Sequence, residues 1–258
     1  MAARLSHTQT GPDDAPVLVL AGALGSAHAM WQAQVDALSD RFRVIALDHR
    51  GHGSSEAPPG PYTMADLGGD VVALLDELGV EQASYIGISL GGMVGLWLAQ
   101  NAPDRWHRFV LMCAAAEPIG GPQPWTERAA QVRADGTAAI ADATIGRWFK
   151  HEYAEAHAEQ VASIKQQILD TSDEGYASCC EAIGAMDLRD GLAGVTAPTL
   201  LLAAEEDSSI PAEHVLALAQ AIPGARFEVI DGAAHLIAVS HADQVNQLLL
   251  DHLTGAEP

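Results

Sequence analysis

The stretch Ala83–Leu98 (ASYIGISLGGMVGLWL) most constrains how this chain can fold, because it joins a strand pattern to a helix pattern. Residues Ala83–Ile88 are almost all apolar or small, as expected of a strand buried on both faces. Residues Gly92–Gln100 are mostly apolar and contain no proline, which is typical of a packed helix. Between them, Gly87–Gly91 (GISLG) matches G-x-S-x-G, a strained turn that exposes a serine hydroxyl. We therefore predict that Ser89 is a nucleophile.

Length and charge limit the classes of protein to consider. The 258 residues, 48% of them hydrophobic, can form one large α/β domain with an ample core. The formal net charge is −21, and the chain has only two lysines, Lys150 and Lys165. This charge disfavours nucleic acid and anionic membranes as partners. An anionic small-molecule substrate would need a local cation in its pocket.

The cysteines and the hydrophobic runs point to a reduced, cytoplasmic location. Cys113, Cys179 and Cys180 cannot form a disulfide framework, and zinc-ligand spacing is absent from the sequence. The first residues lack a signal-peptide pattern, and no run approaches the roughly 20 apolar residues that span a bilayer. We expect a soluble cytoplasmic protein that uses neither a metal nor a cofactor. The sequence leaves the oligomeric state open.

Strand and helix patterns alternate along most of the chain, which predicts an α/β fold with a mostly parallel sheet. An edge strand is expected at Arg4–Thr10. The further expected strands are Val17–Ala21, Arg43–Asp48, Ala83–Ile88, Phe109–Cys113, Thr199–Ala203 and Arg226–Ile230. Ligands of such sheets bind at the carboxyl ends of the strands.

The segment Glu117–Asp190 interrupts this alternation. It begins with a cluster of prolines and glycines and then reads as several short helices without a convincing strand. We expect residues 1–116 and 191–258 to form the core, and residues 117–190 to form a helical cap, or lid.

A serine nucleophile needs a base and a third group that orients the base. In this fold class the order along the chain is serine, acid, histidine. Of the eleven histidines, His235 best fits this order, because it follows the strand Arg226–Ile230 at the edge where Ser89 is expected. We predict that His235 is the base.

The acid is expected just after the strand Thr199–Ala203, where Glu205, Glu206 and Asp207 follow one another. By spacing alone, any of the three could orient His235. We favour Asp207, because a short carboxylate orients an imidazole more rigidly, and keep Glu206 as the second choice. The predicted donors to the oxyanion are the N–H of Leu90 and the N–H of Ala23.

With these residues in place, the sequence resembles the α/β-hydrolases, and within them the 3-oxoadipate enol-lactonases. The general motifs are Leu24-Gly25-Ser26 with Met30-Trp31, Asp48-His49-Arg50-Gly51-His52-Gly53, and the turn at Ser89. The narrower motifs lie in the predicted cap: Trp125-Thr126-Glu127-Arg128, Arg147-Trp148-Phe149, Gly175-Tyr176-Ala177 and Asp187-Leu188-Arg189. One departure is Ala21-Gly22-Ala23, where relatives commonly carry a histidine or an asparagine.

The resemblance implies a serine hydrolase that opens a carboxylated enol-lactone through an acyl-enzyme on Ser89. It also implies a cation for the substrate carboxylate, and Arg147 beside Trp148 is the candidate pair. Arg147 could equally be a surface ion-pair residue, and Trp148 a packing residue. Two alternatives stay open: a broader carboxylesterase or methyl-esterase with a neutral substrate, and a non-catalytic ligand receptor built on the same fold.

Overall fold

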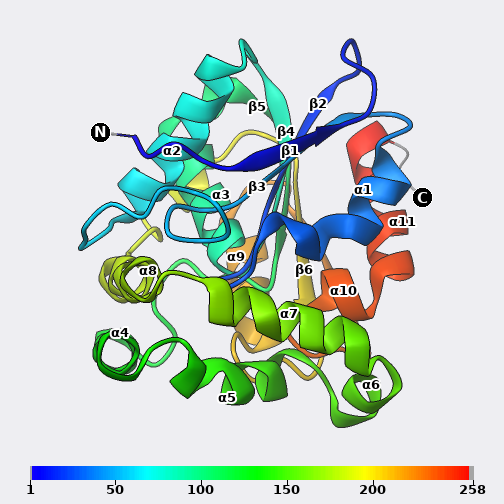
Figure 1. Cartoon of the computed structure of the whole chain (residues 1–258). Helices are drawn as coiled ribbons and strands as arrows, with labels where there is room; N and C mark the ends of the chain where they lie inside the picture. Colours follow the sequence, from blue (N-terminus) through cyan, green and yellow to red (C-terminus); the bar gives the residue numbers. More distant parts are fainter. Residues whose placement is uncertain (1, 256–258) are drawn as a thin grey trace.

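The computed structural model of the chain describes residues 2–255, which form one seven-stranded sheet with helices on both faces (Figure 1). The strands are β1 (His7–Thr10), β2 (Val17–Ala21), β3 (Arg43–Leu47), β4 (Ala83–Ile88), β5 (Trp106–Met112), β6 (Thr199–Ala204) and β7 (Arg226–Ile230). Their order in the sheet is β1-β3-β2-β4-β5-β6-β7; β1 is antiparallel to β3, and all the other pairs are parallel. The prediction of a mostly parallel α/β sheet is confirmed.

Helices cover the two faces of this sheet. In Figure 1, α1 and α11 lie on one side of the strands, and α2 and α3 lie on the other. The α-helices outside the cap are α1 (Gln32–Leu38), α2 (Met64–Glu77), α3 (Leu90–Asn101), α9 (Ala212–Ala221), α10 (Ile237–Ser240) and α11 (Ala242–Thr254). Short 3₁₀ helices are η1 (His28–Trp31), η2 (Pro103–Arg105) and η3 (Leu192–Gly194). Helix α2 begins with a capping box in which Thr63 and Asp66 each bond to the other's backbone N–H, so the sequence fixes where it starts.

Four predicted strands have different ends in the structure. Strand β3 ends one residue earlier than predicted, at Leu47, and β6 ends one residue later, at Ala204. Strand β5 begins at Trp106 rather than Phe109. The edge strand begins at His7 rather than Arg4, because the Ala3 and Arg4 N–H groups bond to the side chains of Asp70 and Glu56. Strand β5 ends at Met112, because Cys113 has a φ of +46°, which is incompatible with a strand. The turn at Cys113 changes the direction of its side chain at the edge of the sheet.

Five α-helices and the short helix η3 connect β5 to β6, and the five α-helices lie in the segment that the sequence predicts to be a cap. They are α4 (Pro122–Asp135), α5 (Ala138–Trp148), α6 (His151–Ala156), α7 (Ala158–Asp170) and α8 (Asp173–Ala185), and Figure 1 shows them grouped in green at the bottom of the molecule. Backbone hydrogen bonds join this group to the core: Ser172 N–H to Gly51 O (3.1 Å), and Leu236 N–H to Trp148 O (3.2 Å). The cap is therefore held on two sides of the sheet edge. Domain boundaries at residues 116 and 191 stay a prediction.

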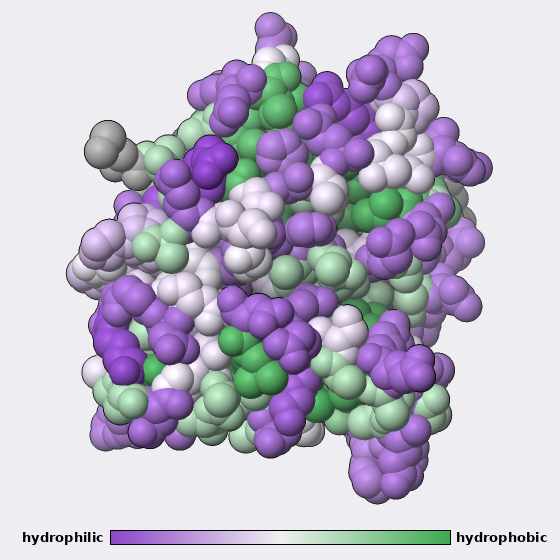
Figure 2. Space-filling view, in the orientation of Figure 1, coloured by the Kyte–Doolittle hydropathy of each residue, from purple (hydrophilic) through white to green (hydrophobic). Residues whose placement is uncertain are grey.

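The core lies between the sheet and the flanking helices. Every residue of β4 and of β6 is buried, which explains why these strands read as continuous apolar or small runs. Hydrophilic side chains cover most of the face shown in Figure 2, with apolar residues scattered among them. Within residues 2–255, none of the helices combines the length and the apolar character needed to cross a membrane. The cytoplasmic location and the exclusion of nucleic acid and membrane as partners stay predictions.

Candidate active site

Ser89 lies on the sharp turn that the sequence predicts. It follows β4 directly, precedes the first residue of α3, and has a φ of +55°, a value rare for residues with a side chain. The flanking glycines make this turn possible, because a Cβ on Gly87 would collide with the backbone of Gly91. A Cβ on Gly91 would in turn collide with the carbonyl group of Ala21 at the end of β2. The G-x-S-x-G match therefore reflects two close backbone approaches.

Asp207 and His235 form a buried hydrogen-bonded pair. His235 Nδ1 lies 2.6 Å from Asp207 Oδ2, and the two residues are 2% and 5% exposed, respectively. Asp207 Oδ1 also accepts hydrogen bonds from the N–H groups of Ser209 (2.8 Å) and Ile210 (3.0 Å). Burial acts to raise the pKa of Asp207, but the neighbouring His235 and these two N–H groups lower it below its ordinary value. Asp207 is therefore held as a carboxylate facing the imidazole.

The other two acids of the β6 loop have different partners. Glu205 accepts a hydrogen bond from the Gly232 N–H (2.7 Å), and Glu206 forms an ion pair with Lys150 of the cap (2.7 Å). Of the three acids that the sequence left open, Asp207 is the one whose carboxylate contacts His235.

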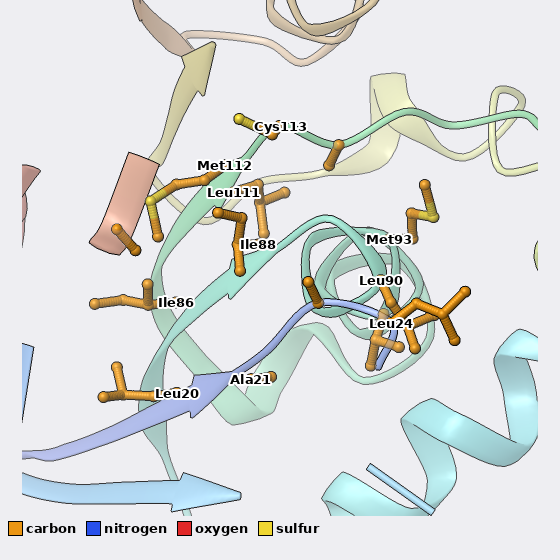
Figure 3. Packing of buried hydrophobic residues seen from close by; sticks show 14 of the residues in the cluster. Leu20, Ala21, Leu24, Ile86, Ile88, Leu90, Met93, Leu111, Met112 and Cys113 are labelled. Carbon is orange, nitrogen blue, oxygen red and sulfur yellow. The ribbon is translucent and has the colours of Figure 1, made fainter. Parts of the chain in front are cut away.

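The two predicted oxyanion donors lie at the same corner of the sheet. The Gly91 N–H donates to Gly22 O (2.9 Å), which ties the start of α3 to the loop after β2. Figure 3 shows this loop passing beside the start of α3. Within residues 2–255, the N–H groups of Ala23 and Leu90 donate no hydrogen bond to a protein acceptor. Both groups are therefore available to an incoming oxygen atom.

The parallel strands align the three predicted catalytic residues along one edge. Ile88 of β4 pairs with Met112 of β5, Met112 pairs with Leu202 of β6, and Ala204 pairs with Ile230 of β7. The loops carrying Ser89, Asp207 and His235 thus leave neighbouring strands on the same side. In the part of the chain that the structure describes, the Ser89 hydroxyl makes no hydrogen bond to His235. Such contacts often tighten only when substrate is bound, and the catalytic roles of the three residues stay a prediction.

Two buried histidines of the His49-Arg50-Gly51-His52 motif lie near the loop that follows β2 (residues 22–26), and His52 bonds to it. His52 Nε2 accepts a hydrogen bond from the Gly25 N–H (2.8 Å), so its proton lies on Nδ1, which faces Arg50 O at 3.0 Å. Burial, followed by the nearby charge of His52, lowers the pKa of His49 to about 3. Burial also lowers the pKa of His52. Both rings are therefore neutral near pH 7.

Arg147 and Trp148 are the last two residues of α5, and Trp148 lies beside His235. The Trp148 ring lies 6.4 Å from the His235 ring, measured between centroids, and is 4% exposed. The half-buried Arg147 is within hydrogen-bond reach of the Thr144 hydroxyl (Nη2–Oγ1 3.3 Å). Burial, and then the charge of Arg128, lower the pKa of Arg147. A second guanidinium group therefore lies close to the one that the sequence identified.

Arg128 is the second cation, and from the sequence it was noted only as the last residue of the motif Trp125-Thr126-Glu127-Arg128. Its Nη2 donates to the same Thr144 hydroxyl (2.8 Å), and its guanidinium lies 5.4 Å from the centroid of the Tyr176 ring. Tyr176 in turn packs against Gly25, since a Cβ on Gly25 would lie 3.1 Å from the Tyr176 ring. Tyr176 therefore contacts both Arg128 and the loop that follows β2, which carries Gly25. Because α4, α5 and α8 each supply one of these groups, sequence spacing alone could not reveal the cluster.

Two polar atoms of this cluster have no hydrogen-bond partner within residues 2–255. Arg128 Nε and the Tyr176 hydroxyl are buried without a hydrogen bond. Within residues 2–255, neither Arg128 nor Arg147 forms a salt bridge. An open hollow of about 320 Å³ borders both arginines. The residues lining it are Pro124, Glu127, Arg128, Gln131, Ala139, Ile140, Ala143 and Arg147. Unpaired, half-buried cations of this kind are suited to an anionic group.

The fold and the sheet-edge geometry define an α/β hydrolase, and comparison with known proteins agrees. Residues 15–242 match the family model described as the alpha/beta hydrolase fold. The chain belongs to this family, and the prediction that it is an enzyme, a hydrolase of this fold, is confirmed.

The most informative relatives are enol-lactonases. The chain is 37% identical to "3-oxoadipate enol-lactonase 2" of Acinetobacter baylyi, over 94% of this chain and 90% of the relative. Its structure is similar to the crystal structure of the enol-lactonase from Burkholderia xenovorans, with a TM-score of 0.95 over 98% of this chain and 97% of the other. The two sequences are 40% identical. The chain is also 32% identical to "Putative carbamate hydrolase RutD" of Stutzerimonas stutzeri, over 96% and 94% of the two chains. The predicted resemblance to the 3-oxoadipate enol-lactonases is confirmed.

Proposed function

We propose that this enzyme hydrolyses a carboxylated enol-lactone, with 3-oxoadipate enol-lactone as substrate and 3-oxoadipate as product. The observation that carries the proposal is the pair Arg128 and Arg147, two neighbouring half-buried guanidinium groups without an acidic partner among the described residues. In a chain with a net charge of −21, two adjacent cations left unpaired are costly unless a ligand supplies the opposite charge. The likeness to enol-lactonases supports the same substrate.

The arginine pair suits a substrate whose carboxylate projects away from the reacting ester. Arg147 is followed by Trp148, which lies beside His235, and Arg128 contacts Tyr176, which packs on the loop that follows β2. These contacts link the arginine pair to the residues around the sheet edge, and in the proposal the pair binds the substrate carboxylate while the lactone ring reacts at Ser89. Two guanidinium groups can also bind one carboxylate through several charge-assisted hydrogen bonds.

Formation of the acyl-enzyme is the first half of the proposed reaction. Ser89 Oγ attacks the ring carbonyl carbon while His235 Nε2 accepts the hydroxyl proton, and Asp207 stabilises the imidazolium. The N–H groups of Ala23 and Leu90 bind the negative charge that develops on the carbonyl oxygen. The ring C–O bond then breaks, and the released enol oxygen takes the proton from His235. The enol tautomerises to the ketone while the acyl group stays on Ser89.

Hydrolysis of the acyl-enzyme completes the cycle. Water enters the site, gives one proton to His235 and attacks the acyl carbon, and the oxyanion forms again at the same two N–H groups. Collapse of this second intermediate returns the proton from His235 to Ser89 Oγ and releases the free acid. The sum is one lactone and one water converted to one keto diacid.

Progress curves with purified, metal-free enzyme test the proposal. We expect kcat/KM for the enol-lactone to exceed that for p-nitrophenyl acetate by about 100-fold or more, because only the lactone carries the carboxylate. Equal or faster turnover of neutral esters would favour the broader esterase. Turnover of a carbamate in preference to the lactone would favour the activity named for the Stutzerimonas relative. Stoichiometric binding without turnover would favour a receptor.

A further inference from the structure

Cys113 is a buried thiol next to the Asp207–His235 pair, and the proposed mechanism gives it no role. Its Sγ, a carboxylate oxygen of Asp207 and a ring nitrogen of His235 all lie within 4.8 Å of one another. The Cys113 side chain is fully buried. A thiol at this position either only fills space in the core or forms a hydrogen bond with Asp207 or His235.

The backbone at Cys113 has an unusual conformation, with a positive φ. Ser89 and Cys113 are the non-glycine residues with a positive φ among residues 2–255, and both directly follow strands that are neighbours in the sheet. The Cys113 N–H donates to Leu202 O of β6 (2.8 Å), which fixes the backbone while the chain leaves the strand. Figure 3 shows Cys113 at the end of β5, with its sulfur on the side away from α3. The turn therefore directs the thiol toward the loop that carries Asp207.

The hydrogen bonds of Asp207 leave one acceptor site for this thiol. A carboxylate offers about four lone-pair sites. Oδ1 accepts the N–H groups of Ser209 and Ile210, whereas Oδ2 accepts only His235 Nδ1. The second lone-pair site of Oδ2 thus accepts no hydrogen bond from another donor within residues 2–255. The Cys113 sulfur lies within 4.8 Å of a carboxylate oxygen of Asp207, so a modest approach brings it within hydrogen-bond distance.

The protonation of the thiol also fits a donor. Burial, and then the charge of Asp207, raise the pKa of Cys113 well above its ordinary value, so the sulfur keeps its hydrogen. A metal ion bound by these three groups would require a thiolate and a His235 Nδ1 without its proton. Both requirements conflict with a buried thiol beside a carboxylate and with the 2.6 Å bond between His235 and Asp207. The cluster is therefore better suited to hydrogen bonding than to metal binding.

We propose that Cys113 is a positioning residue whose S–H donates to Asp207 Oδ2 and keeps that oxygen aligned with His235 Nδ1. This role rests on the proposed serine-hydrolase function, because it acts through the pair that activates Ser89. With the thiol in place, all four acceptor sites of Asp207 are occupied. The carboxylate then has no alternative orientation that preserves its hydrogen bonds.

Substitutions at Cys113 separate a donor from a packing residue. We expect Cys113→Ala to lower kcat about tenfold with KM changed less than about twofold, because the effect is on the base and not on substrate binding. Cys113→Ser keeps a donor of similar size and should retain kcat within about threefold. Cys179 is a fully buried cysteine of α8. Cys179→Ala is therefore the matched control for loss of a buried thiol and should leave kcat unchanged. If Cys113→Ala fails to fold, Cys113→Val fills the volume without a donor and replaces it.

A spectroscopic measurement tests the same role without substrate. The proton between His235 Nδ1 and Asp207 Oδ2 should give a far-downfield ¹H NMR resonance. We expect it to broaden and move upfield in Cys113→Ala and to stay in place in Cys113→Ser and Cys179→Ala. An unchanged resonance or an unchanged kcat in Cys113→Ala would overturn the proposal. Failure of the wild-type enzyme to open the lactone would instead overturn the proposed substrate, while p-nitrophenyl acetate turnover and the resonance still report on Cys113.

Discussion

The two sides of the candidate site are built in different ways. On the sheet edge, Asp207 and His235 are almost completely buried and hydrogen-bonded to each other, and their loops follow aligned parallel strands. On the cap side, Arg128 and Arg147 are half-buried on separate helices, and two polar atoms of their cluster have no partner among the residues that the structure describes. A rigid, satisfied edge suits the shared chemistry of a fold. A cluster with open hydrogen-bond sites suits the recognition of one particular substrate.

The contrast predicts that changes on the sheet edge abolish turnover whatever the substrate. Replacing Ser89 with alanine should lower kcat by at least about 10⁴-fold for both the lactone and p-nitrophenyl acetate, because no other nucleophile replaces it. Rate measurements with both substrates check this. The melting temperature should change little, which serves as the control for folding. Appreciable lactonase activity of the folded variant would rule out Ser89.

The acids that follow β6 provide a sharper test of the same edge. Asp207→Asn should lower kcat by about 10³- to 10⁴-fold, because the amide no longer orients and stabilises the imidazolium. Glu206→Gln removes an exposed ion pair with Lys150 and should change kcat less than about twofold. The two variants have the same net charge, so steady-state kinetics compares position alone. The opposite ranking would assign the acid to Glu206.

Changes on the cap side should depend on the substrate. Arg147→Ala should raise KM for the carboxylated lactone about 10- to 100-fold while changing KM for a neutral ester less than about threefold. The matched control is Arg133→Gln on α4, whose guanidinium is already paired with Glu174 and Glu181. It removes the same charge and should leave both KM values unchanged. Equal effects of Arg147→Ala on the two substrates would contradict a carboxylate site.

The effect expected to be smallest near neutral pH is a pH dependence of stability that comes from the core and not from the cap. The pKa of His49 is about 3 when folded, below its ordinary value of 6.5, so the unfolded chain binds the proton first as the pH falls. Stability should therefore be complete above about pH 6.5 and decrease toward pH 3, by about 1 kcal/mol per pH unit for this residue. Urea unfolding at several pH values should show a shallower slope for His49→Gln. A slope in His49→Gln equal to that of the wild type would contradict this origin of the pH dependence.

The fold was largely predictable because its signals are local. Buried parallel strands require apolar runs, and the helices between them require caps and helical spacing, so β2, β4 and β7 were predicted with their observed ends. The predicted ends of β1, β3, β5 and β6 were wrong, and the clearest case is β5, where Cys113 has strand-like neighbours but a left-handed backbone. Strand propensity carries no information about such a turn, because the contacts that hold Cys113 come from β6.

By itself, the sequence determined the strand–serine–helix turn, since Gly87 and Gly91 are the residues that its close backbone approaches allow. It also determined the order serine, acid, histidine, because each follows a recognisable strand. Only the tertiary structure decided which of three adjacent acids contacts His235, that Arg128 joins Arg147, and that the Cys113 thiol lies beside Asp207. The physical reason is that spacing along a chain defines the faces of one element, whereas contacts between side chains on different elements depend on how those elements pack.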